Sequence, residues 1–218
     1  AKLIILQTDL KNKEMALQAA NEVLENQQAA MAAQAEQIDA LIGIRPRIIT
    51  ALSSALSSAN LSATVDHSTG DIVLDSSVLF DTGKSEIRAE GKALLDRFVP
   101  VYLNVLLRDE YSAYLGEIII EGYTDSTGDY YNNLKLSQDR ALSVATYILK
   151  MPGLTTRQRD LLKSGLLTIT GRGATGLIYD QYGNEDKEAS RRVEFHFSLK
   201  DSEMIDQMNR LLQQTEGD

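Results

Sequence analysis

The chain has 218 residues, of which 43% are hydrophobic, and its formal net charge is −9 at pH 7. This size fits one medium-sized domain with an appendage. The acidic balance argues against a nucleic-acid partner and against attachment to an anionic bilayer, because both need a surface rich in Lys and Arg. The lack of cysteine excludes disulfides and thiolate metal sites. No apolar run of about 18 residues occurs, so we expect no membrane-spanning helix within the chain.

Residues 1–42 are expected to form one helix, since they lack Gly and Pro and are rich in Ala, Gln, Leu and Glu. A seven-residue repeat of apolar side chains marks one seam of a coiled coil: Leu3, Leu10, Leu17, Leu24, Met31 and Ile38. A second seam, three residues further on, is apolar only in part. The pattern predicts a parallel homodimer, with an isolated helix as the alternative. The apolar start, residues 1–6, is expected to follow a removed membrane anchor.

The spacing of apolar and turn residues predicts the later elements. Gly43 and Pro46 are expected to end the first helix, and a second helix over 47–59 completes a helical stalk over residues 1–59. A β-hairpin is predicted from 61–66 and 71–75, with a short extended piece at 78–80. The pattern then predicts a helix over 87–109, a short helical piece over 110–115, a strand over 117–121, helices over 132–150 and 155–164, and strands over 166–170 and 193–199.

This order of elements predicts an α+β fold, an α/β sandwich in which helices pack on one mixed β-sheet. The domain is expected over residues 60–200. Residues 201–218 are expected to form a closing amphipathic helix, over 201–214, and a tail.

No catalytic group of residues stands out. His67 and His196 have no second His, Cys, Asp or Glu at ligand spacing in the sequence, so neither is expected to bind a metal. The run Gly171-Arg-Gly173 does not open a helix, and Gly83-Lys84-Ser85 lacks the upstream Gly of a phosphate-binding loop. We therefore expect no enzyme activity, no metal and no cofactor.

The most informative stretch begins where a buried strand ends at Gly122 and opens into a polar loop that holds Asp125. Ser137 is a candidate N-cap, which would put Arg140 in the first turn of the following helix. Asp125 and Arg140 would then share one end of the layer, where loops often carry binding groups. Such a pair can bind a zwitterion: the ligand carboxylate would accept two hydrogen bonds from the planar guanidinium of Arg140, and the ligand ammonium would pair with Asp125. A structural Asp125–Arg140 salt bridge is the equal alternative.

Four ordered blocks over residues 78–197 resemble the OmpA-like C-terminal domain. They are Leu79-Phe80-Asp81 with Gly83-Lys84-Ser85, the stretch 120–128, Asn133 with Leu136-Ser137, Arg140-Ala141 and Val144, and Arg191-Arg192-Val193-Glu194. The resemblance implies non-covalent binding of the peptide stem of peptidoglycan, with Asp125 and Arg140 holding the amino acid end of diaminopimelate. It further implies that Thr124, Asn133 and Arg191 line the site, and that Gly83 and Leu136 are secondary contacts.

The chain departs from the family pattern at a few places. Tyr123 stands where the family usually has His, and Ser190 where it usually has Asn. A Pro expected soon after Gly173 is missing, and residues 103–115 look like an insertion. None of these changes removes Asp125 or Arg140, so we expect the chain to bind peptidoglycan, with changed contacts at the edge of the binding site.

Within the family, the helical stalk looks like that of the stator B-subunits, the MotB-like proteins of flagellar motors and of related motors, including anti-phage systems. This resemblance implies a homodimer on the periplasmic side that tethers an inner-membrane complex to peptidoglycan. It also implies a membrane helix ahead of residue 1 that pairs with a channel partner. The alternatives are a periplasmic assembly or interaction module, and an outer-membrane-associated OmpA-like tail.

Overall fold

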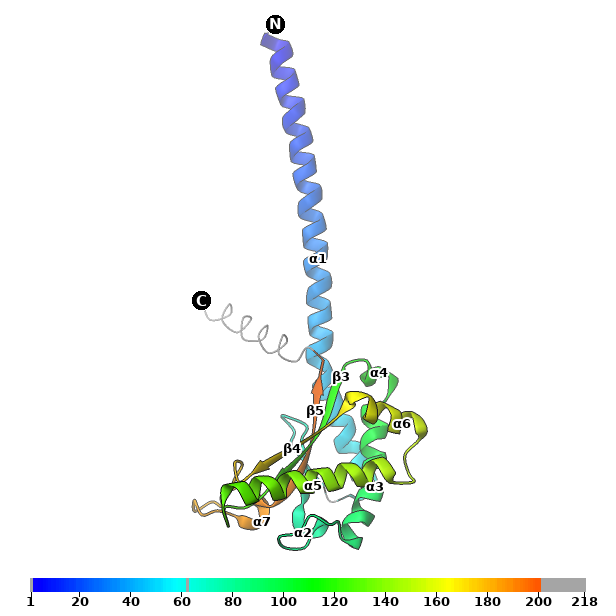
Figure 1. Cartoon of the computed structure of the whole chain (residues 1–218). Coiled ribbons are helices and arrows are strands. Elements are labelled where there is room, and N and C mark those ends of the chain that lie inside the picture. Colours follow the sequence, from blue (N-terminus) through cyan, green and yellow to red (C-terminus); the bar gives the residue numbers. More distant parts are fainter. Residues whose placement is uncertain (1, 62, 201–218) are drawn as a thin grey trace. The chain divides into compact units, whose positions relative to one another are not determined.

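The computed structural model describes residues 2–61 and 63–200 (Figure 1). The closing helix expected over 201–214 lies outside these residues. The helices are α1 (Lys2–Ser58), α2 (Ser76–Leu79), α3 (Ala89–Leu106), α4 (Asp109–Ser112), α5 (Tyr130–Lys150), α6 (Thr156–Leu161), the π-helical turn η1 (Leu162–Leu166) and α7 (Lys187–Ser190). The strands are β1 (Thr64–Val65), β2 (Ile72–Asp75), β3 (Leu115–Tyr123), β4 (Leu167–Gly173) and β5 (Arg192–Leu199). No described helix contains a stretch apolar enough to cross a membrane.

A single helix, α1, replaces the two that were expected at the start of the chain. The expectation that Gly43 and Pro46 end the first helix is wrong, because both lie inside α1. A proline within a helix removes its own N–H bond and costs about 3 kcal/mol. Apolar burial on the same helix offsets this cost, at roughly 1.5–3 kcal/mol for each fully buried side chain. The buried side chains, each at most 4% exposed, are Ile44, Ile48, Leu52 and Leu56.

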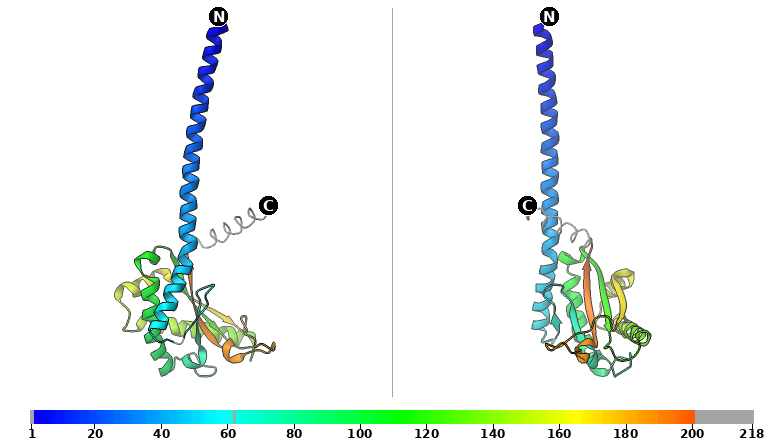
Figure 2. Two further views of the ribbon diagram at one scale, coloured as in Figure 1. Left: turned by 180° about the vertical axis from the view of Figure 1, so that it is seen from behind. Right: turned by 90° about the vertical axis from the view of Figure 1, so that its left-hand side faces the viewer.

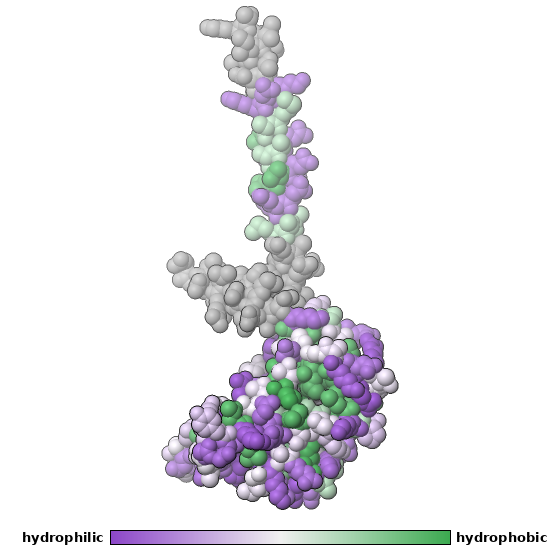
Figure 3. Space-filling view, in the orientation of Figure 1, coloured by the Kyte–Doolittle hydropathy of each residue, from purple (hydrophilic) through white to green (hydrophobic). Residues whose placement is uncertain are grey.

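The chain divides into two compact units, Ala1–Gly43 and Ile44–Asp218. The division lies ahead of the boundary expected between residues 59 and 60, because the last turns of α1 pack into the core of the second unit. In the first unit the predicted seam is exposed along its described part, at 61% for Leu10, 63% for Leu17, 52% for Leu24 and 69% for Met31. Figure 3 shows apolar and polar side chains along this part of the helix.

The sheet has five strands in the order β1-β2-β5-β3-β4. Strand β3 pairs in parallel with β4, and the other neighbours are antiparallel, so the expected mixed sheet with helices packed on it is confirmed (Figure 2). The expected hairpin is present as β1 and β2. The extended piece expected at 78–80 is wrong for most of its length, because α2 covers Ser76–Leu79. Asp75 caps α2 by accepting a hydrogen bond from the Ser77 amide at 2.7 Å.

The helices pack on one face of the sheet. Phe195 of β5 meets the rings of Phe98 and Tyr102 of α3, with centroid distances of 4.9 and 5.8 Å. Helix α5 approaches β3 and β4 closely because Gly122 and Gly171 have no side chain on that face. A Cβ atom on Gly122 would lie 2.2 Å from the Ser137 carbonyl oxygen. These two glycines therefore set the position of α5 on the sheet.

The two ends of the sheet differ in what they carry. At one end, β2, β3 and β4 finish and β5 begins, so the loops that follow Asp75 and Tyr123 come together with Arg192. At the other end, Leu115 of β3 pairs with Leu199 of β5. The chain enters the domain near that second end, where Arg45 donates to the Thr69 carbonyl at 2.9 Å and lies over the Phe197 ring.

Candidate functional site

The loop after β3 is held in one conformation by backbone and side-chain hydrogen bonds. The Thr124 amide donates to the Gly173 carbonyl at 2.8 Å, which ties the loop to the end of β4. Asn133, buried on α5, donates to the carbonyls of Asp125 at 3.3 Å and Thr127 at 3.0 Å. Asp129 caps α5. The loop therefore presents the Asp125 carboxylate from a fixed backbone.

Asp125 is paired with Arg191. Arg191 Nη1 lies 2.6 Å from a carboxylate oxygen of Asp125, and the Thr127 amide donates to the other oxygen at 2.9 Å. Burial alone raises the pKa of this carboxyl, but these hydrogen bonds outweigh it and hold the pKa below its usual value. A mutual Asp125–Arg140 salt bridge, the structural alternative considered from the sequence, is therefore wrong: the internal partner of Asp125 is Arg191.

Arg140 is buried on α5, at 3% exposure, and is only partly satisfied. Its Nε donates to the Lys84 carbonyl at 3.0 Å and its Nη2 to the Asp81 carbonyl at 3.4 Å, which holds the loop that follows α2. The Phe80 ring lies 5.1 Å from its guanidinium carbon. Nη1 has no hydrogen-bond partner among the described residues. Burial and the nearby charge of Arg191 lower the pKa of Arg140, and the negative charge of an incoming anion would act against both effects.

Arg140 sits in the middle of α5 and not in its first turn. The expectation that Ser137 is the N-cap is wrong, because Asp129 caps the helix and Ser137 lies fully buried inside it. The Ser137 hydroxyl instead accepts a hydrogen bond from the Gly173 amide at 2.8 Å and so fastens α5 to β4. A mid-helix position gives Arg140 a firmer backbone than a helix end would.

A pocket of about 170 Å³ opens beside Arg140. It is bounded by α2, by the loop that follows it, by α5 and by the residues just before α3 and β5. Guanidinium groups dominate its charge, since it has three arginines and one aspartate. The lining residues are Ser76, Ser77, Phe80, Asp81, Thr82, Arg88, Arg140 and Arg191.

The structure brings together some of the predicted site residues and not others. Arg140 and Arg191 line the pocket, and Asp125 joins it through Arg191. Thr124 and Asn133 shape the adjoining loop, and the buried Thr124 Oγ1 has no partner among the described residues. The two secondary contacts, Gly83 and Leu136, do not line this pocket. Gly83 has a φ of 69° in the loop after α2, where its left-handed backbone favours glycine.

Sequence reasoning missed Ser76, Ser77 and Arg88 as lining residues. The two serines lie between the segments 71–75 and 78–80, for which the sequence predicts extended structure, whereas the structure has the capped helix α2. The Asp75-Ser-Ser sequence could have signalled that cap. Arg88 carries no local signal, since it reaches the pocket from the residue just before α3.

The two departures from the family pattern have their own contacts. The Tyr123 hydroxyl donates to the Glu121 carboxylate at 2.6 Å, and its ring lies 4.0 Å from the Arg192 guanidinium carbon. Ser190 is fully buried, and its hydroxyl accepts from the Ile178 amide at 2.9 Å. Tyr123 therefore belongs to the charged residues around Glu121 and Arg192, and Ser190 holds the segment at Ile178 next to Arg191.

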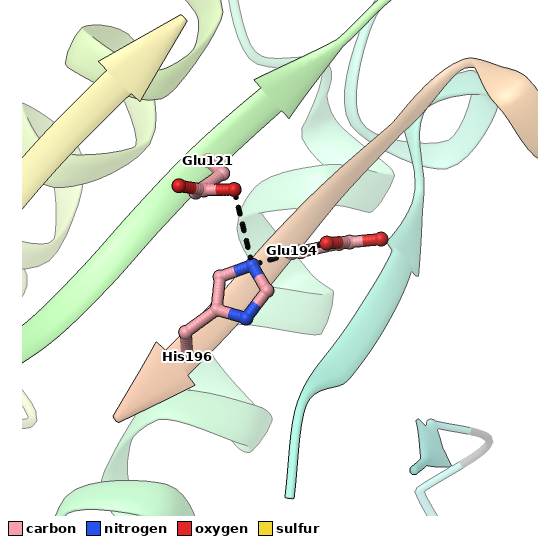
Figure 4. A group of neighbouring side chains, drawn as sticks. All are labelled: Glu121, Glu194 and His196. Carbon is pink, nitrogen blue, oxygen red and sulfur yellow. Dashed lines mark ion pairs between the residues drawn. The ribbon is translucent and has the colours of Figure 1, made fainter. Parts of the chain in front are cut away.

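A charged cluster surrounds His196 on the sheet face opposite the helices (Figure 4). The sequence has no carboxylate at ligand spacing from His196, yet the fold brings three around it: strand pairing brings Asp71 and Glu121 near, and the strand's period of two places Glu194 on the same face. Nδ1 lies 2.6 Å from the Asp71 carboxylate, and Nε2 lies 3.0 Å from Glu194 and 3.3 Å from Glu121. Glu121, Glu194 and His196 thus form a candidate metal-ligand set, with ligand atoms within 4.8 Å of one another.

Charge balance favours a proton over a metal ion in this cluster. Arg172 lies 2.6 Å from Glu121, and Arg192 lies 2.5 Å from Glu194, so two guanidiniums face the three carboxylates. A protonated His196 brings the group to zero net charge, whereas a divalent ion on a neutral ring would leave it positive. Burial alone lowers the pKa of His196, but the carboxylates outweigh it and raise the pKa to about 9.

The His196 cluster predicts a pH dependence of stability. The pKa of His196 is raised from 6.5 to about 9, so the protonated ring stabilises the folded state. This contribution is complete below pH 6.5 and is lost as the pH rises through about 9. The free energy of unfolding should therefore fall by on the order of 2–3 kcal/mol over that range. Urea unfolding across the range measures it. His196→Asn should remove this slope, and the exposed His67→Asn should keep it. An equal slope in both variants would show that the stabilising proton resides elsewhere.

Comparison with known proteins gives a family match for the sequence and a solved structure with the same fold. The sequence pattern of the OmpA family matches residues 79–191. The chain is 37% identical over 142 residues to the Zorya protein ZorB of Escherichia coli (strain ATCC 8739), an alignment that covers 61% of this chain and 59% of that protein. It is 36% identical over 118 residues to outer membrane protein A of Serratia odorifera, covering 54% of this chain and 42% of that protein.

Among solved structures, a MotB-like protein from Desulfovibrio vulgaris shares the fold, with a TM-score of 0.53 at 21% identity over 74% of this chain and 95% of that chain. A second Zorya protein ZorB, from Escherichia coli O139:H28, is 34% identical over 56% of this chain and 50% of that protein. The match thus spans about half to three fifths of the length of the Zorya proteins.

Proposed function

Because this chain belongs to the OmpA family, whose pattern covers residues 79–191, we propose that it binds peptidoglycan without cleaving it and anchors a membrane complex to the cell wall on the periplasmic side. The observation that carries the proposal is buried Arg140, which lines a pocket rich in guanidinium groups and whose Nη1 has no hydrogen-bond partner among the described residues. A buried guanidinium without a full set of acceptors is costly. A ligand carboxylate would remove that cost.

The ligand is the diaminopimelate end of the stem peptide. Its carboxylate binds Arg140, and its ammonium binds Asp125 at the oxygen that Arg191 now occupies. Arg191 is 40% exposed in its side chain, so it can turn toward the same carboxylate when the ammonium replaces it. Co-sedimentation with purified sacculi tests the binding, and excess free meso-diaminopimelate should compete. No co-sedimentation by the folded parent would leave the alternative, an assembly or interaction module.

We infer further that the anchored complex is a stator-type motor. Similarity to two Zorya proteins ZorB, the shared fold with a MotB-like protein and the long helix α1 support a stator subunit. An outer-membrane tail is the second candidate, because relatives named outer membrane protein A also match. A membrane channel partner belongs to the stator proposal. Co-purification of the full-length protein with an inner-membrane complex, rather than with outer-membrane fractions, distinguishes the two.

The stalk is expected to form a homodimer through its exposed seam. Leu17→Asp combined with Leu24→Asp should convert the dimer to a monomer, because each buried leucine contributes roughly 1.5–3 kcal/mol and a carboxylate cannot replace it. Sedimentation of the full chain measures the change. Gln18→Asp with Asn26→Asp adds the same charge beside the seam and should stay dimeric. A parent protein that is monomeric at high concentration would contradict the coiled coil.

A further inference from the structure

Ser76 is the second unsatisfied group in the pocket. Its side chain is 2% exposed and begins α2, and its hydroxyl has no hydrogen-bond partner among the described residues. Its backbone amide is occupied, since it donates to the Arg191 carbonyl at 3.2 Å. Ser76 and Arg140 therefore both line the same cavity, each with a buried polar atom left without a partner.

Nothing in the fold requires a hydroxyl at this place. Asp75, not Ser76, caps α2, and an unpaired buried hydroxyl costs roughly 1–3 kcal/mol. An alanine would fit the same space without that cost. The Ser76 hydroxyl is satisfied only when a ligand in the pocket forms a hydrogen bond with it.

We propose that Ser76 contacts the ligand directly, donating a hydrogen bond to the carboxylate that Arg140 binds, so that the site selects a free carboxylate over a carboxamide. This inference rests on the proposed peptidoglycan function and names a residue that decides its specificity. A carboxylate only accepts hydrogen bonds, and a guanidinium only donates them. With Ser76 added, the donors around Arg140 suit both oxygens of one carboxylate.

The charge of the pocket supports the same selectivity. Arg88 lines it as a third guanidinium, with its Nη1 held by the Ser77 carbonyl at 2.9 Å. A carboxamide would present two N–H donors to a wall composed mainly of donors, and it would bring no charge to offset the arginines. Amidated diaminopimelate should therefore bind poorly.

The test measures affinity by calorimetry on the full chain with two probes. One is a stem tripeptide that ends in meso-diaminopimelate. The other is the same peptide with an amide in place of one diaminopimelate carboxylate, the one beside the free amino group. The parent should prefer the carboxylate form by about tenfold or more, the scale of one charge-assisted hydrogen bond. Ser76→Ala should weaken binding of the carboxylate form by about tenfold and leave the amidated form nearly unchanged.

Ser53→Ala is the matched control, since Ser53 also has a buried hydroxyl without a partner but lies on α1 and does not line the pocket. It should bind both peptides as the parent does. Melting temperatures should confirm that both variants fold, and the preference of the parent requires no variant at all. Equal affinity of the parent for both peptides, or unchanged selectivity in Ser76→Ala, overturns the role of Ser76. A parent that binds neither peptide nor sacculi overturns the proposed function itself.

Discussion

Arg140→Ala is expected to abolish binding to sacculi while the domain stays folded. In the proposed complex, Arg140 Nη1 is the buried donor to the ligand carboxylate, and truncating one partner of a desolvated charge pair costs about 2–5 kcal/mol. Each ~1.4 kcal/mol is a tenfold loss of affinity, so co-sedimentation should fall to background. Arg140→Lys should fail as well, because a point charge cannot hold the loop carbonyls of Asp81 and Lys84 and also bind a carboxylate.

Binding and melting temperature should be measured together on these variants. Loss of two hydrogen bonds to the loop should lower the melting temperature of Arg140→Ala somewhat, without unfolding it at room temperature. Arg157→Ala removes an exposed guanidinium on α6, away from the pocket, and should change neither quantity. Full sacculus binding by a folded Arg140→Ala protein would contradict the assignment of this site.

Gly122→Ala is expected to cause a large loss of stability and, with it, a loss of binding. The added Cβ would lie 2.2 Å from the Ser137 carbonyl oxygen, which is backbone and cannot turn aside. Helix α5 must then move away from β3, and overpacking of this kind costs about 1–3 kcal/mol or more. Because Arg140 is on the same helix, less than one turn beyond Ser137, the shift also displaces the binding group.

Urea unfolding checks the stability of this variant, and Gly43→Ala is its control. A Cβ on Gly43 meets nothing within 4 Å, and the residue lies inside α1. The control should therefore gain about 0.4–1 kcal/mol from the reduced freedom of the unfolded chain. If Gly122→Ala unfolded at the same urea concentration as the parent, the close contact of α5 with the sheet would be disproved.

Patterns with a local cause were predictable from the sequence. The helices α3, α5 and α6 and the strands β3, β4 and β5 follow from the apolar period and from turn residues. A distant contact overrides a local signal at Pro46, which stays within α1 because the apolar residues on either side of it are buried in the core of the domain. The helix α2 differs, because its cap Asp75 is a local signal that stands in the sequence.

The sequence predicted which residues of the candidate site lie near one another, but not which of them form hydrogen bonds and ion pairs. The sequence placed Asp125 and Arg140 near one another, yet the direct partner of Asp125 is Arg191, 66 residues later in the chain. The same limitation applies to His196, whose partner Glu121 lies on the neighbouring strand β3 and whose partner Asp71 directly precedes β2. Side chains that meet through sheet pairing leave no periodic trace in a single sequence, so their pairing requires the register of the strands.

The pocket lies at one end of β3 and β5, and the residues around Arg45, where α1 joins the domain, lie at the other end. This arrangement has a mechanical consequence. If a ligand fixed in the wall is pulled against the residues around Arg45, the tension runs along these strands. Their hydrogen bonds lie perpendicular to the strand direction, from the pair Leu115–Leu199 to the pair Gly122–Val193. Tension along the strands therefore does not separate these hydrogen bonds one at a time from an end.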